Sequence, residues 1–172
     1  MKIIASIVIL AIVLVIAFLF FIYLGIYNVS AIEPHSRPIR WVMSTTMDNS
    51  VRRHAAGISA PPLTDADMVR RGAGYYQTSC ATCHGAPGVA RATFAKGLNP
   101  APPSLAGAVS DWTPAELFWI VKNGVRMTGM PAFAPAYDEA QLWALIAFLQ
   151  RLPALSPQDY QTLVKGIGAG PQ

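Results

Sequence analysis

The sequence predicts an all-α protein in which one membrane-spanning helix and one amphipathic linker helix precede a small helical domain. An uncharged apolar run covers residues 3–27. Later segments begin at capping residues and carry apolar side chains at helical spacing. The period-two alternation that strands require is not found in the sequence. These observations define the fold class, and 172 residues leave room for about one domain of ordinary size.

The N-terminal run is interrupted only by Ser6 and Gly25. At a rise of 1.5 Å per residue, such a helix is long enough to cross a bilayer with some tilt. A cleaved signal peptide is the alternative, because residues 29–31 (Val-Ser-Ala) are similar to a small-residue cleavage site. The apolar part of a signal peptide, however, spans only about 7 to 15 residues. We therefore expect residues 1–27 to form an uncleaved transmembrane anchor.

Residues 28–63 form a linker with a predicted helix of its own. Ser36 and Pro38 are typical of a helix start, and Gly57 is typical of a stop. Within this helix, one apolar stripe recurs every four residues: Ile39, Met43, Met47 and Val51. We expect residues 36–57 either to dock on a partner through this stripe or to act as a solvated spacer.

The charge of the chain is unevenly distributed. Residues 1–63 carry five Lys or Arg against two acidic residues, whereas residues 64–172 carry eight against seven. The basic linker therefore suits anionic lipid headgroups or a partner protein. Nothing beyond the high isoelectric point supports nucleic-acid binding, and we expect no nucleic-acid partner.

Three helices are predicted within the domain, residues 64–155. These are residues 68–79, 114–123 and 138–151. Thr64 and Asp67 form a plausible capping box for the first helix. Asp111 or Thr113 can cap the second. Residues 156–172 are expected to form a C-terminal tail.

Cys80-Ala81-Thr82-Cys83-His84 is the attachment signature of a c-type haem. Two thiols at this spacing can form thioethers to the porphyrin vinyl groups, and the following imidazole can ligate the iron. A thioredoxin-like pair would need a βαβ pattern, and a zinc site needs four ligands, whereas the chain has two cysteines and three histidines. A disulfide across two residues would be strained. We expect one covalent haem c on Cys80 and Cys83, with His84 as an axial ligand.

The haem motif and its surroundings resemble the class I cytochromes c over about residues 64–152. Gly72-x-x-x-Tyr76-x-x-x-Cys80-x-x-Cys83-His84-Gly85 is similar to the family's first helix and haem loop. Residues 138–152 are similar to its terminal helix. The resemblance implies a class I cytochrome c fold, in which Gly72 lets the terminal helix cross the first closely and Phe148 is the aromatic partner.

Residues 129–133 (Gly-Met-Pro-Ala-Phe) resemble the family's axial-methionine loop. The resemblance implies that Met130 is the second axial ligand. Met127 is the nearest rival, but Pro-Ala-Phe does not follow it. A thioether is a neutral donor that favours ferrous iron and raises the reduction potential.

A proline-containing loop holds the axial histidine in the family, and residues 102–105 resemble it, with Pro102 or Pro103 undecided. Other pocket residues are expected as well, although the tryptophans are as readily explained as core residues. The full set expected around the haem is Tyr76, Pro102, Pro103, Leu105, Trp112, Trp119, Asn123, Pro131 and Phe133.

With both axial positions filled, the iron has no open position for a substrate. We therefore expect an electron carrier in a bacterial respiratory or related chain, without a substrate site of its own. The alternative is a tightly bound subunit of a membrane oxidoreductase, such as a terminal oxidase, a quinol-oxidising complex or a dehydrogenase. A peroxidase or gas sensor is disfavoured by Met130. Because haem c is attached outside the bacterial cytoplasmic membrane, we expect a single-pass protein with a periplasmic haem domain.

Overall fold

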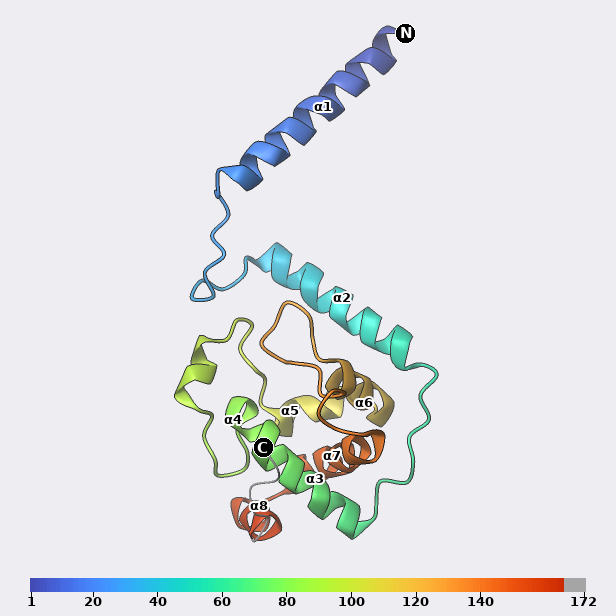
Figure 1. Ribbon diagram of the computed structural model, residues 1–172, viewed down its shortest axis with the longest axis vertical. Coiled ribbons are helices and arrows are strands. Elements are labelled where there is room, and N and C mark those ends of the chain that lie inside the picture. The colour runs from blue at the N-terminus through green and yellow to red at the C-terminus, as the bar shows by residue number, and fades with distance from the viewer. Residues whose placement is uncertain (166–172) are drawn as a thin grey trace. The chain divides into compact units, whose positions relative to one another are not determined.

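A computed structural model describes residues 1–165, and it is built from helices joined by loops (Figure 1). Within this range, extended pairing is limited to one isolated bridge between Ala86 and Val89. The α-helices are α1 (Lys2–Tyr23), α2 (Arg37–Ala55), α3 (Ala66–Ser79), α4 (Ala81–His84), α5 (Leu105–Ala108), α6 (Pro114–Asn123), α7 (Glu139–Arg151) and α8 (Pro157–Val164). Short 3-10 helices are η1 (Thr93–Gly97), η2 (Val109–Asp111) and η3 (Leu152–Ala154). The predicted all-α class is confirmed.

The chain divides into two compact units, Met1–Glu33 and the part that begins at Pro34. The first unit contains α1, whose most apolar window has a mean hydropathy of 3.4. Among residues 1–165, α1 is the helix that is long and apolar enough to cross a membrane. It ends at Tyr23, four residues before the predicted end of the anchor.

Helices α3 and α7 cross at close range and form the centre of the second unit (Figure 1). A Cβ added to Gly72 would lie 1.9 Å from the carbonyl oxygen of Ala144 and 2.9 Å from Cβ of Phe148. The Phe148 ring packs against Tyr76, with 5.1 Å between the ring centroids. Only a residue without a side chain allows this approach. The predicted crossing at Gly72, with Phe148 as its aromatic partner, is confirmed.

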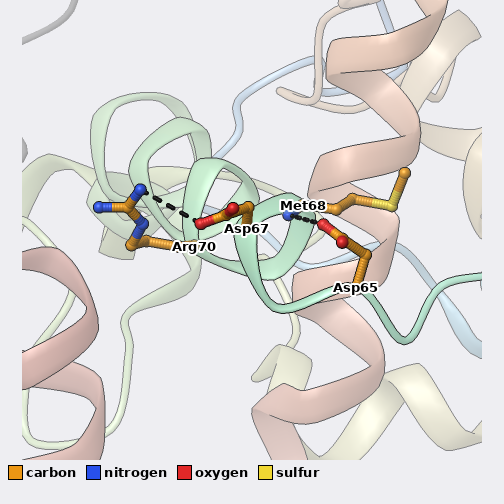
Figure 2. A network of polar contacts seen from close by, with 4 residues as sticks. All are labelled: Asp65, Asp67, Met68 and Arg70. Atoms are coloured by element: carbon orange, nitrogen blue, oxygen red, sulfur yellow. Dashed lines mark hydrogen bonds and ion pairs between the residues drawn. The ribbon is translucent and has the colours of Figure 1, made fainter.

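The start of α3 differs from the prediction (Figure 2). Asp65 is the N-cap, and its carboxylate accepts a hydrogen bond from the backbone N–H of Met68 at 2.6 Å. The predicted capping box between Thr64 and Asp67 is therefore wrong. Asp67 lies in the first turn, where its charge complements the helix dipole, and it pairs with Arg70 at 3.3 Å.

Helices α6 and α7 each begin at a capping box. The hydroxyl of Thr113 accepts a hydrogen bond from the backbone of Glu116, and the Asp138 carboxylate accepts one from Gln141. In turn, the side chain of each N3 residue accepts a hydrogen bond from the N-cap backbone N–H. Two otherwise unpaired donors are thus satisfied at each helix start. Of the two predicted caps for α6, the structure uses Thr113 and not Asp111.

The residues that follow α7 contribute to the core. Tyr160 of α8 is buried, and its hydroxyl donates to the side-chain oxygen of Gln77 on α3. The segment predicted as a tail, residues 156–172, therefore starts with a packed helix. Its last part, residues 166–172, lies outside the described residues.

The linker segment contains the predicted amphipathic helix as α2, which packs beside α6 in the second unit (Figure 1). Val51 has 0% of its surface exposed, and Ala55 is also buried. The His54 ring stacks on Trp119 of α6, with 5.4 Å between ring centroids. The C-terminal half of α2 is thus part of the same folded body as the haem motif.

This packing corrects the expectation that residues 36–57 dock on a partner through the whole apolar stripe. The stripe is covered within the chain at its C-terminal end, because Val51 is already buried there. The N-terminal half of α2 is different, since Trp41 and Val42 are exposed. The exposed apolar surface of α2 therefore lies on its N-terminal half.

Candidate haem site

The cysteine motif occupies one turn between two helices. Cys80 ends α3 and begins α4, so it caps both helices. The backbone N–H of His84 donates to the carbonyl of Cys80 at 2.9 Å, and that of Cys83 donates to the same oxygen at 3.1 Å. Neither cysteine is part of a disulfide. This turn brings both thiols and the imidazole together in a short stretch of chain.

Tyr76 fixes the backbone that leaves this turn. Its buried hydroxyl donates to the carbonyl of Gly85 at 2.5 Å. Burial raises the pKa of Tyr76, so the hydroxyl keeps its proton and acts as the donor. The residue after His84 is therefore tied to α3 by a buried hydrogen bond.

A cavity of about 290 Å³ opens beside this turn. Cys80, Cys83 and His84 line it from one sequence region, and Met130 lines it from another. Most of the remaining lining is apolar, and it includes side chains from α6, α7 and the loop before α5. The cavity therefore combines an apolar interior with two thiols, one imidazole and one thioether.

His84 is oriented by a backbone carbonyl. Its Nδ1 atom lies 2.9 Å from the carbonyl oxygen of Pro103. A carbonyl can only accept, so Nδ1 carries the proton and Nε2 keeps its lone pair. Burial lowers the pKa of His84, against the opposing effect of the Pro103 hydrogen bond. The imidazole is thus neutral and has one nitrogen free to bind a metal.

Met130 lies in a loop that folds back onto the end of α6. Its backbone N–H donates to the hydroxyl of Thr128 at 3.0 Å, and that hydroxyl donates to the carbonyl of Val125 at 2.7 Å. Further along, the N–H of Phe133 donates to the Val121 carbonyl on α6 at 3.2 Å. These bonds hold the methionine against the cavity.

The loop can return only because Gly124 ends α6. Gly124 has φ +67°, and a Cβ there would lie 2.5 Å from the carbonyl carbon of Pro131. Both the backbone conformation and the close approach require glycine. Met127 lies on the outside of this loop, 70% exposed, and does not line the cavity.

Comparison with protein families identifies the region that contains this site. Residues 67–149 match the family model described as cytochrome c oxidase, cbb3-type, subunit III. This region is a c-type cytochrome domain. A comparison with curated proteins finds no match to the chain.

The cytochrome domain binds one haem c covalently, and the residues of the cavity fit that group. The motif offers two thiols for thioether bonds, and the neutral imidazole of His84 and the thioether of Met130 are both suitable iron ligands. The apolar lining suits a porphyrin. Bound haem supplies a single iron that cycles between the ferric and ferrous states.

Most of the pocket residues expected from the sequence line the cavity. These are Pro102, Pro103, Leu105, Trp112, Pro131 and Phe133. Trp119 lies elsewhere, stacked on His54, and its carbonyl accepts a hydrogen bond from the exposed Asn123 amide. Tyr76 does not line this cavity either; its hydroxyl donates to the carbonyl of Gly85. Of the two prolines, Pro103 provides the carbonyl that orients His84.

Sequence reasoning missed some of the residues that line the cavity. Leu117, Ile120 and Val121 of α6 and Leu145 of α7 line it, although no motif in the sequence marks them as haem contacts. Met47 of α2 also lines the cavity, although the sequence indicates only that it belongs to an apolar stripe. Its place in the apolar stripe was the available signal, but the stripe does not indicate which surface covers it.

A second cavity, of about 540 Å³, also touches the motif. It shares His84 and Leu105 with the first cavity and is also lined by Tyr76 and Arg91. Neither cysteine nor Met130 lines it. It therefore lacks the attachment groups that haem c requires.

Proposed function

We propose that the chain is a membrane-anchored monohaem cytochrome c that transfers single electrons, with His84 and Met130 as the axial ligands. The observation that supports this most strongly is the shared cavity, which brings both residues together with Cys80 and Cys83. A His/Met pair is a combination that cytochromes c use for electron transfer. The cysteines are proposed to hold the haem through thioether bonds.

The two ligands are suited to different parts of this task. The Pro103 carbonyl holds His84 in the tautomer that leaves Nε2 able to bind iron. Met130 provides a soft, neutral sulfur, which favours the ferrous state. With a side chain on each side of the iron, no position is open for a substrate. The protein then acts by excluding water and by keeping the ligands fixed.

We further propose that α1 anchors the protein in a bacterial cytoplasmic membrane, with the haem domain on the periplasmic side. The length and hydropathy of α1 support the anchor. The side is supported by the haem, because haem c is attached outside the bacterial cytoplasm. Anchoring confines electron transfer to partners at the same membrane surface, as in a respiratory chain.

A stable subunit of a larger membrane oxidoreductase is the second candidate. The description of the matching family, a subunit of a cbb3-type cytochrome oxidase, favours it. The exposed Trp41 and Val42 on α2 also favour it, because they offer apolar surface to a partner. Isolation from membranes in mild detergent separates the candidates: a subunit copurifies with an integral-membrane enzyme in fixed ratio, whereas a carrier does not.

The ligand pair is tested by two methionine variants. A Met-to-iron charge-transfer band should be present at the red end of the ferric spectrum of the parent, and Met130→Ala should abolish it. The reduction potential should fall in the same variant, because the neutral sulfur no longer favours ferrous iron. Met127→Ala is the matched control and should keep both properties. If Met127→Ala loses the band and Met130→Ala keeps it, the assignment is wrong.

A further inference from the structure

One residue that lines the haem cavity comes from outside the cytochrome domain. Among the described residues that line it, Met47 alone lies outside the matched region, residues 67–149. Met47 belongs to α2, which precedes the domain in sequence. The domain therefore leaves part of its own cavity wall to a neighbouring segment.

Helix α2 is held in a way that fixes Met47. Val51 lies one turn further along the same stripe and is fully buried. On the next turn, Ala55 is buried and His54 stacks on Trp119 of α6. Ile58, just after the helix, packs against the core. Packing of this kind holds the helix far better than its intrinsic propensity would.

We propose that α2 is a fixed wall of the haem site and that Met47 is a positioning residue, which keeps water from the haem and so raises its reduction potential. This inference rests on the proposed electron-transfer function. Oxidised haem carries one more positive charge than reduced haem. An apolar, dry surrounding disfavours the more charged state. A polar group at residue 47 would admit water and favour the ferric form.

The proposal also changes which part of the chain acts as a tether. If α2 belongs to the haem site, the segment between membrane helix and haem body is residues 24–36, not residues 28–63. Thirteen residues reach at most about 45 Å when fully extended. The haem domain then moves with α2 and not independently of it.

The test compares Met47→Gln with Met43→Gln in the full-length haem protein. Met43 is the matched control, because it lies one turn earlier on the same stripe, is 37% exposed and does not line the cavity. We expect Met47→Gln to shift the ferric–ferrous equilibrium toward ferric by roughly three- to tenfold, where tenfold corresponds to about 59 mV. Met43→Gln should keep the parent potential. Met47→Leu should restore it, because leucine is apolar and similar in size.

A potential for Met47→Gln equal to that of Met43→Gln overturns the proposal, and so does a Met47→Leu variant as low in potential as Met47→Gln. The charge-transfer band should persist in all three variants, which separates exposure of the cavity from loss of Met130. If Met47→Gln does not fold, amide hydrogen exchange of the parent protein tests whether α2 is held as firmly as the helices of the domain. Residues 47–55 should be protected as strongly as α6, and exchange at the rate of an unfolded peptide overturns the proposal. If the parent itself shows no reversible one-electron couple, the proposed function fails instead.

Discussion

The two sides of the haem cavity are built in different ways. On the histidine side, Cys80, Cys83 and His84 lie in one turn, and short backbone bonds set their spacing. On the methionine side, Met130 depends on a loop that is bonded back to α6. The first side is encoded locally, whereas the second exists only when the tertiary structure is formed.

This difference implies different stabilities. A covalently tethered turn keeps its ligand near the iron even when the surroundings loosen. The Met130 loop is held by a few partly exposed hydrogen bonds and by the return at Gly124, so local opening should affect it first. Single substitutions should therefore be able to disturb the methionine side alone, the histidine side alone, or both sides together.

The largest effect is expected for Gly72→Ala, which disturbs both sides. The new methyl group would lie 1.9 Å from a backbone oxygen of α7, which cannot yield as a flexible side chain does. We expect a loss of several kcal/mol in the free energy of unfolding, at or above the ~1–3 kcal/mol of most overpacked cores. Denaturant unfolding of the haem protein measures it.

Gly57→Ala provides the matched control for that variant. Nothing lies within 4 Å of a Cβ placed at Gly57. Its stability should stay close to that of the parent. Equal stabilities of the two variants would mean that α3 and α7 do not cross closely at Gly72.

Several features of the two sides of the cavity could be predicted from the sequence. The thiol spacing, the Gly72 crossing and the Met130 loop each depend on a short motif. The N-cap of α3 could not be chosen, because Thr64 and Asp65 are both good caps and the exact helix start decides between them.

The face that each α6 side chain presents was also ambiguous. Apolar residues occupy every position from Leu117 to Val121, so periodicity could not separate the haem side from the α2 side. Trp119 was expected near the haem but lies against His54. The covering of the α2 stripe by the same chain could not be inferred at all, since an amphipathic pattern does not identify the surface that covers it.

Gly124→Ala should damage the methionine side and leave the histidine side intact. Alanine is strained at φ +67°, and its Cβ would meet the Pro131 backbone at 2.5 Å. We expect about 1–3 kcal/mol of destabilisation, a weakened or absent charge-transfer band and a lower reduction potential. Haem should remain covalently attached, as judged by denaturing electrophoresis with haem staining. An unchanged band would show that Met130 does not need this return of the loop.

The narrowest effect is expected for Tyr76→Phe, which touches only the histidine side and should lower stability without changing the ligation of the iron. The variant leaves the buried Gly85 carbonyl without its hydroxyl donor. This should cost about 1–3 kcal/mol, because a buried acceptor is left unsatisfied. The charge-transfer band should persist in the folded ferric protein. Loss of the band without loss of stability would contradict the separation of the two sides.

The central claim, that Met130 and His84 share one iron in a common cavity, is tested most directly by NMR of the ferrous protein with ¹³C-labelled methionine methyl groups. The chain has six methionines. An axial methionine lies directly over the haem ring, whose ring current shifts its methyl resonance far upfield. We predict one such resonance, absent in Met130→Ala and retained in Met127→Ala. A spectrum without this resonance, or one that loses it in Met127→Ala, would contradict the account.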